Sequence, residues 1–154
     1  MSRFELTAPL LLAAVLAVAG CGKDEPPPLA AGCADRQQLA AALQSAPGTV
    51  SLENGTRISA CVDSARSDSD LMTLGYAITA VADGLADQGR SGNRNAALQL
   101  GYLVGAADRG AKGSQGIQTE LAYRLESSAR RLEAAGPAAR QAFEQGRRIG
   151  RAQG

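Results

Sequence analysis

Hydrophobic residues recur every three or four positions along much of the chain, the spacing that places them on one face of an α-helix. The clearest such stripe consists of five residues: Leu71, Leu74, Ile78, Val81 and Leu85. It follows a Ser-Asp-Ser-Asp segment at 67–70, whose short polar side chains and negative charge favour a helix start. The pattern predicts an amphipathic helix that runs from this segment to about Gln88 and ends at a Gly-Arg-Ser-Gly sequence.

The same spacing predicts four further helices, at residues 34–46, 93 to about 111, 115–135 and 138 to about 151. The helix that begins at residue 93 is apolar nearly all round, which indicates a central, buried element. Within it, Gly101 and Gly105 lie one turn apart and would let another helix approach closely.

Residues 49–62 alternate between apolar and polar side chains, as a half-buried strand does. Val50 and Leu52 precede an Asn-Gly turn, and Ile58 follows it. A three-residue loop with a left-handed Gly55 would bring the apolar residues to one face of a hairpin. We therefore expect a short β-hairpin, packed on helices because a lone hairpin is only marginally stable in water.

The chain starts with an apolar run from Leu10 to Ala19, preceded by a short segment that carries Arg3. A membrane-crossing helix needs roughly 20 apolar residues, so this run is too short to be one. It has instead the length of the apolar core of a secretory signal, about 7–15 residues.

The motif at the end of this run, Val18-Ala19-Gly20-Cys21, resembles the lipobox of bacterial lipoproteins, in which an apolar residue and two small ones precede a cysteine. The resemblance implies that the chain is cut before Cys21, whose sulfur carries a diacylglycerol and whose new amine is acylated. Residues 1–20 are then a signal peptide, 21–32 a lipidated cysteine with a proline-rich tether, and 33–154 a single helical domain. Two alternatives remain, an ordinary secretory signal with an incidental cysteine and an apolar helix that is never removed.

The chain has three cysteines, and an odd number in an exported protein needs an explanation. If Cys21 carries lipid, Cys33 and Cys61 remain as a pair that an oxidising compartment would join. Such a bond would stabilise the domain by roughly 3–4 kcal/mol. The alternative is two separate buried thiols.

The composition argues against the commoner catalytic and metal sites. The chain has no His and no Trp, so the usual general base and the commonest transition-metal ligand are missing. Asp83 and Asp87 are spaced to share a cation on one helix face, but no ligand-rich loop accompanies them, and solvated acids are the expected state. We expect no enzyme activity, no cofactor and no metal.

The charge is unevenly distributed, although the net charge is only +1. Residues 21–88 contain nine acidic and four basic side chains, and residues 89–154 contain five acidic and eleven basic ones. The basic half is a candidate surface for an envelope protein or an anionic polymer, centred on Arg124, Arg130, Arg147 and Arg148. The alternative is that these charges face the acidic half of the same domain. Nucleic acid is not expected, because aromatic residues do not interleave the basic ones.

A short internal echo offers a different candidate site. Leu74-Gly75-Tyr76 recurs as Leu100-Gly101-Tyr102. Two tyrosines in equivalent places could line an apolar pocket for a small molecule. The alternative is that Tyr76 and Tyr102 only pack beside the crossing of two core helices.

Together these features predict a mainly α fold, a bundle of about five helices with one short β-hairpin stapled by a disulfide. The expected function is that of a non-catalytic lipoprotein, held in a membrane by Cys21, that binds an envelope protein or polymer. The alternative function is small-molecule binding. The expected location is the outer side of the cytoplasmic membrane, or an outer membrane if the host has one.

Overall fold

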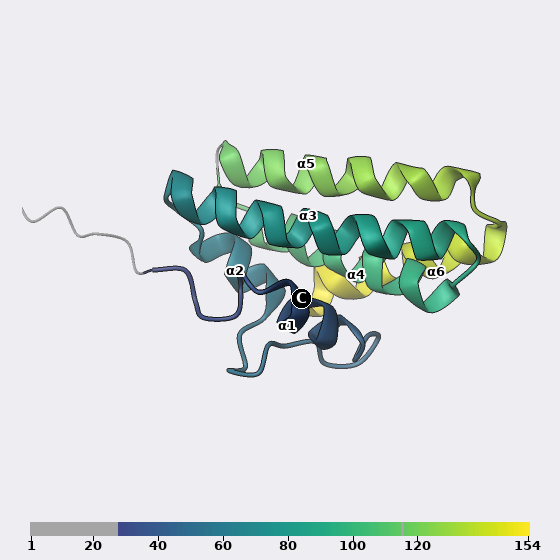
Figure 1. Ribbon diagram of the computed structural model, residues 1–154, viewed down its shortest axis with the longest axis horizontal. Coiled ribbons are helices and arrows are strands. Elements are labelled where there is room, and N and C mark those ends of the chain that lie inside the picture. Colours follow the sequence, from purple (N-terminus) through teal and green to yellow (C-terminus); the bar gives the residue numbers. More distant parts are fainter. Residues whose placement is uncertain (1–27, 115) are drawn as a thin grey trace, which may run out of the picture.

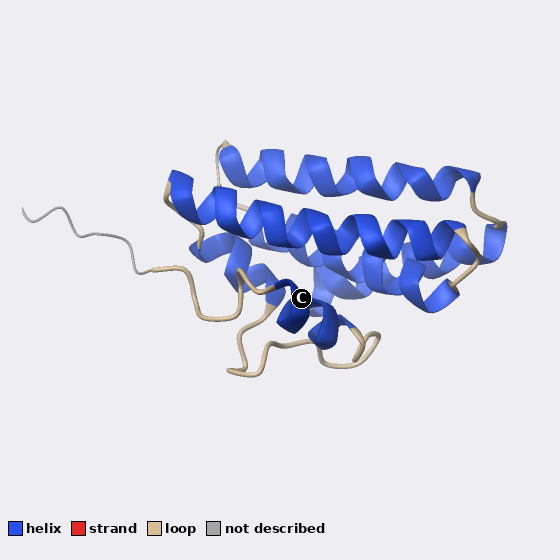
Figure 2. Cartoon of the chain, in the orientation of Figure 1, coloured by secondary structure: helices blue, strands red, loops and turns tan. Residues whose placement is uncertain are grey.

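The computed structural model describes residues 28–114 and 116–154, and all regular structure within those residues is helical (Figures 1 and 2). The described residues form six α-helices and one 3₁₀ helix: α1 (Arg36–Leu43), α2 (Ile58–Ser64), α3 (Asp68–Arg90), α4 (Arg94–Gly110), α5 (Ile117–Ala129), η1 (Arg130–Ala134) and α6 (Pro137–Gln153). The prediction of a mainly helical fold is confirmed. The sequence predicted about five helices, and five of the observed helices correspond to them. Helix α2 and the 3₁₀ helix η1 are the two additional ones.

The four long helices lie side by side as a bundle. In the view of Figure 1, α3 lies in front of α4 and α6, and α5 runs above α3. Helix α4 contacts α2, α3, α5 and α6, and most of its residues are buried. A helix surrounded in this way cannot keep a polar face, which explains why its sequence is apolar nearly all round. The expectation of a central helix here is therefore confirmed.

Helices α4 and α6 make the closest contact in the domain, backbone against backbone. Four glycines, two on each helix, form the crossing: Gly101, Gly105, Gly146 and Gly150. A Cβ atom at Gly101 would overlap the carbonyl oxygen of Phe143, and one at Gly146 would overlap that of Leu98. Glycine is required here because its lack of a side chain lets two helix backbones touch.

Short polar side chains begin three of the helices, as the sequence predicts for the main one. Ser67 Oγ accepts a hydrogen bond from the Asp70 N–H at 3.1 Å at the start of α3. Asn93 caps α4 in the same way, with its Oδ1 3.1 Å from the Ala96 nitrogen. Asp35 caps α1. Each cap satisfies an N–H group that the helix leaves without a partner.

The prediction of a β-hairpin at residues 49–62 is wrong. Its turn forms as expected, with Gly55 at φ +80° and the Leu52 N–H donating to the Thr56 carbonyl at 2.9 Å. The second strand does not form, because the chain enters helix α2 at Ile58. Ile58, Cys61 and Val62 of α2 repeat at helical spacing and are buried, whereas Ala60 is exposed. Burial therefore favours the helix over the short alternation seen in the sequence.

The predicted disulfide is confirmed. Cys33 and Cys61 are bonded, with their Cα atoms 5.6 Å apart, and neither is exposed to solvent. The bond joins the segment before α1 to helix α2, rather than to the hairpin that the sequence suggested. It therefore fixes the two short helices to each other at one side of the bundle.

The single helix predicted at 115–135 is wrong in its last turns. Helix α5 ends at Ala129, and η1 continues as a tighter 3₁₀ helix. Leu132 in η1 is buried and lies against Gly89 of α3, where a Cβ would come within 2.7 Å of its side chain. The tighter winding turns this part of the chain out of the register of α5, and Pro137 then starts α6.

Residues 1–27, which include the predicted signal peptide and Cys21, lie outside the described residues. Among the residues that are described, none of the helices combines the length and the hydropathy that a membrane crossing requires.

Candidate functional site

The two tyrosines of the internal echo lie in different environments, and the structure does not bring them together. Tyr102 on α4 is 1% exposed and packs in the core, whereas Tyr76 on α3 is 72% exposed. Burial raises the pKa of the Tyr102 hydroxyl above its usual value, although the charges of Arg57 and Arg109 oppose that shift. The hydroxyl faces the backbone at Val50 without a hydrogen bond of good geometry.

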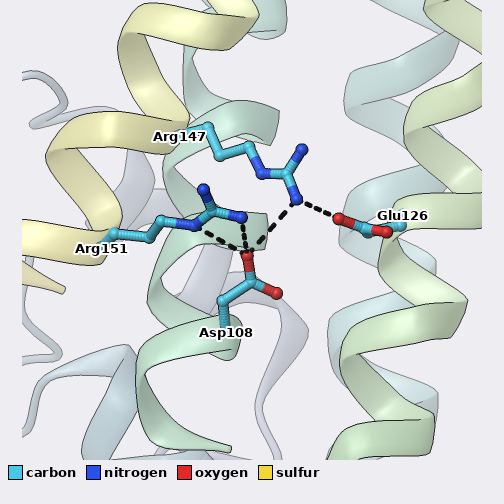
Figure 3. Close-up of polar contacts among 4 residues, drawn as sticks. All are labelled: Asp108, Glu126, Arg147 and Arg151. Carbon is cyan, nitrogen blue, oxygen red and sulfur yellow. Dashed lines mark hydrogen bonds and ion pairs between the residues drawn. The ribbon is translucent and has the colours of Figure 1, made fainter. Parts of the chain in front are cut away.

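Arg147 is part of an ion-pair network between α4, α5 and α6 (Figure 3). Its guanidinium contacts the Glu126 carboxylate and lies 3.5 Å from Asp108 Oδ2. Arg151 approaches the same Asp108 oxygen at 2.6 Å. The side chains of Arg147 and Asp108 are 23% and 19% exposed, so these charges are largely removed from solvent. Arg147 thus holds the domain's own helices together.

The other three predicted partner-binding arginines lie at the surface. Arg124 on α5 pairs with Glu120 at 3.0 Å, one helical turn away. Arg130 lies with its guanidinium 5.5 Å from the centre of the Tyr123 ring. Arg148 on α6 is exposed. Arg130 and Arg147 line one pocket of about 350 Å³, which also contains Glu126, Glu133 and Glu144, whereas Arg124 and Arg148 do not line it. The four arginines therefore do not form one basic patch.

Asp83 and Asp87 do share a cation, and it is Arg131. The Arg131 guanidinium lies 3.3 Å from Asp83 and 3.8 Å from Asp87. The Ser128 hydroxyl also donates to Asp83 at 2.8 Å. Across residues 28–114 and 116–154, no group of three or more acidic, cysteine or histidine side chains is placed to hold a metal ion.

The outer face of α3 carries the most prominent apolar side chains on the surface. Met72 is 78% exposed and Tyr76, one turn later, is 72% exposed. The Arg36 guanidinium of α1 lies over the Tyr76 ring at 5.7 Å from its centre, a cation–π contact between α1 and α3. Contiguous exposed apolar side chains can mark a protein contact site, whereas single ones need no explanation, and Met72 and Tyr76 adjoin each other.

A groove runs along each side of this face. The groove between α3 and α5 has a volume of about 710 Å³ and contains Met72 and Tyr76 in one wall. The groove between α1 and α3 has a volume of about 320 Å³, and Ala40, Ala80 and Gly84 form part of its lining. Both are open at the surface, and neither contains Tyr102.

The second half of the α3 face is made of small side chains. Ala80 is half-buried and Gly84 is exposed. A Cβ at Gly84 would meet nothing within 4 Å, in contrast to the glycines of α4 and α6. The outer face of α3 therefore carries large apolar side chains near its start, and leaves open space beside small residues at Ala80 and Gly84.

Sequence reasoning missed several residues that matter here. Met72 lies outside the buried stripe and exactly one turn before Tyr76, a position that predicts exposure beside that ring. Gly146 and Gly150 repeat the four-residue spacing of the two α4 glycines, and that match could have identified the partner helix. The role of Arg131 had no local signal, because its carboxylate partners are more than 40 residues away in sequence.

Comparisons with known proteins identify no relative: no protein-family model, no curated protein and no solved structure matches the chain. Function is therefore argued from the residues of this chain.

Proposed function

We propose that this chain is a lipid-anchored protein of a bacterial cell envelope that acts without catalysis, by binding another protein through the outer face of α3. The observation that carries the proposal is the pair of exposed apolar side chains, Met72 and Tyr76, on a helix held rigidly by the bundle. Burying two such side chains against a partner removes apolar area from water, which is the main driving force of protein association.

The anchor is supported by the Val18-Ala19-Gly20-Cys21 motif and by the remaining cysteines. The Cys33–Cys61 bond uses the other two thiols. A disulfide of this kind persists in the oxidising compartments outside the cytoplasm. Two or more acyl chains at Cys21 would make membrane attachment stable.

A protein partner is favoured over an anionic polymer by the state of the arginines. A polymer site needs positive charges that are free to meet the ligand. Arg147 and Arg124 instead contact carboxylates of the same domain. Arg130 lines a pocket together with Arg147 and Arg140, but three glutamates line the same pocket and balance their charge. The α3 face is therefore the better candidate surface.

The anchor is tested by the intact mass of the native protein, extracted from membranes without reductant. The expected mass is that of residues 21–154 plus acyl chains, less the two hydrogens lost in the disulfide. The Cys21→Ser variant should carry no acyl mass. An unmodified full-length mass with three free thiols would refute both the anchor and the envelope location.

The binding surface is tested by a photo-cross-linking amino acid, placed at Met72 in the full-length chain and activated in cells. A discrete protein adduct is expected at Met72 and not at Gln141, an exposed position on α6 that serves as the matched control. Loss of the adduct in a Tyr76→Ala background would show that the face itself is responsible. Equal labelling from both positions, or none from Met72, would reject the α3 surface.

A further inference from the structure

We infer that the protein bound by the outer face of α3 is a second copy of this chain, packed antiparallel across a two-fold axis that passes beside Ala80. The inference rests on the proposed function and names its partner. It starts from the arrangement of large and small residues on one helix face, and from the position of the groove between α1 and α3.

The large and small halves of the face are equally distant from Ala80. Tyr76 lies four residues before it and Gly84 four residues after it. At 1.5 Å per residue, each is about 6 Å from Ala80 along the helix axis. A two-fold axis beside Ala80 that reverses the helix direction therefore brings Tyr76 of each copy to the level of Gly84 of the other. Both contacts form at once, as a self-complementary interface requires.

The groove beside Gly84 can receive the ring. It has a volume of about 320 Å³, and its lining includes the apolar side chains of Ala40, Val81 and Leu85. Gln37 and Gln88 also line it, and their amides offer a donor and an acceptor to a phenol hydroxyl. Such a site, apolar with polar groups beside it, suits the amphipathic shape of tyrosine.

The alternative, a parallel pair, does not fit the same surface. It would set Tyr76 against Tyr76 and leave the hollow halves facing each other. It would also align the acidic first turn of α3, with Asp68 and Asp70, against its own copy. In the antiparallel pair that acidic turn runs alongside the last turn of the other copy, which carries Arg90. Opposite charges and opposite helix ends then lie together.

Gly84 supports the assignment because the monomer gives no reason for it. A glycine inside a helix lowers stability relative to alanine. Gly101 and Gly146 are justified by backbones that a Cβ would overlap, whereas a Cβ at Gly84 would meet nothing within 4 Å. The ring of Tyr76 from a second copy supplies the missing neighbour.

Membrane attachment adds to the association. One helix face buries less area than a stable dimer of soluble proteins usually requires. Two copies anchored in one bilayer have a high effective concentration, which raises the dimer fraction without any new contact. A two-fold axis along the membrane normal leaves both tethers on the same side of the dimer. The pair is therefore to be sought with the full-length chain in membranes.

The test is cysteine cross-linking of the full-length chain in isolated membranes with a short bis-maleimide, read on denaturing gels. Ala80→Cys should shift from the monomer position to twice the monomer mass, because the two-fold axis brings this residue next to itself. Two differently tagged variants, Ser69→Cys and Ser91→Cys, lie eleven residues on either side of Ala80 at exposed positions and leave Tyr76 and Gly84 intact. They should cross-link to each other when expressed together, and each much less to itself.

Two controls set the background, the chain without an added cysteine and Gln141→Cys on α6. Cross-linking of Gln141→Cys to the same extent as Ala80→Cys would overturn the inference, since it would reflect random collision. So would self-linking of Ser69→Cys that exceeds its linking to Ser91→Cys, which would indicate a parallel pair.

The outcomes also separate this inference from the proposed function. If Met72 photo-cross-links to a different protein and Ala80→Cys gives no dimer, the α3 face binds a partner but not a second copy. If the photo-cross-linker at Met72 forms an adduct with a second copy and Ala80→Cys also dimerises, both hold. If neither position gives an adduct in a folded chain, the α3 binding surface and the antiparallel dimer are both rejected.

Discussion

Tyr102 is the largest fully buried side chain in the described part of the molecule, and its hydroxyl has no hydrogen-bond partner there. A buried hydroxyl without a partner costs free energy, because water is lost and nothing replaces it. Burial also raises its pKa, since the charged phenolate is disfavoured away from water. Because of Tyr102, the free energy of unfolding should fall when the pH becomes alkaline.

The sign of that dependence follows from proton binding. The unfolded chain releases the Tyr102 proton near pH 10, the usual pKa of tyrosine. The folded chain holds it to higher pH because its pKa is raised. The stability linked to this group is fully present below about pH 10 and is lost as the pH rises from there through the folded pKa.

The Tyr102→Phe variant removes the hydroxyl and keeps the ring. We expect it to be neutral or more stable by about 1 kcal/mol at pH 7, because it removes an unpaired buried polar group. We also expect a smaller loss of stability above about pH 10 than the natural chain shows. Urea unfolding at both pH values measures this. A variant destabilised by more than about 1 kcal/mol at pH 7 would mean that the hydroxyl has a partner in solution.

At the scale of elements, the α4–α6 crossing is the contact that tolerates least change. The backbone atoms of the two helices meet at four glycines, and a Cβ at any of them would overlap a carbonyl oxygen of the other helix. Cα–H groups close to such carbonyls add weak favourable contacts. The outer face of α3 is the opposite case, with open space beside Gly84.

These two environments predict opposite effects of one substitution. Gly146→Ala should destabilise the domain by about 1–3 kcal/mol, because its Cβ would overlap the Leu98 carbonyl oxygen. Gly84→Ala, the matched control, should stabilise the monomer by about 0.5–1 kcal/mol, since alanine is the better helix former and has space. Thermal unfolding of dilute protein measures both. Equal effects at the two sites would contradict the close crossing.

At the scale of the whole molecule, long-range ion pairs and the disulfide connect parts that are distant in sequence. The network around Arg147 ties α6 to α4 and α5 (Figure 3). Arg131 ties η1 to the end of α3. The charge asymmetry of the sequence is thus partly used within the domain, where bases of the second half meet acids of the first, as at Arg131 and Asp83.

The contribution of the Arg147 ion pairs to stability can be measured by comparing Arg147 with its exposed neighbour Arg148 on α6. Arg147→Met keeps the apolar stem but leaves Glu126 without its ion pair, and we expect a loss of about 1–2 kcal/mol because the network is only partly exposed. Arg148→Met removes an exposed charge and should change stability by less than about 0.5 kcal/mol. Urea unfolding at low salt compares them. An equal effect would mean that the network contributes nothing beyond a surface charge.

Much of the fold could be predicted from the sequence, because helix starts and stripes are local signals. The caps at Ser67 and the apolar stripe of α3 needed only neighbouring residues. The binding face could not be found in the same way. Met72 and Tyr76 are ordinary members of an amphipathic helix until the position of α5 leaves them exposed beside the groove between α3 and α5.

The sequence by itself determined the helical class and the central place of α4, because these depend on periodicity. It indicated the pairing of Cys33 with Cys61 only through the lipobox resemblance, which sets Cys21 aside. Only the tertiary structure determined which of the two Leu-Gly-Tyr segments has a buried tyrosine. Tyr102 is buried in the core, while Tyr76 is exposed to solvent. It also decided that Ile58 begins a helix. The physical reason is the same in each case: burial is set by which elements pack against a residue, and a short local pattern does not specify its neighbours.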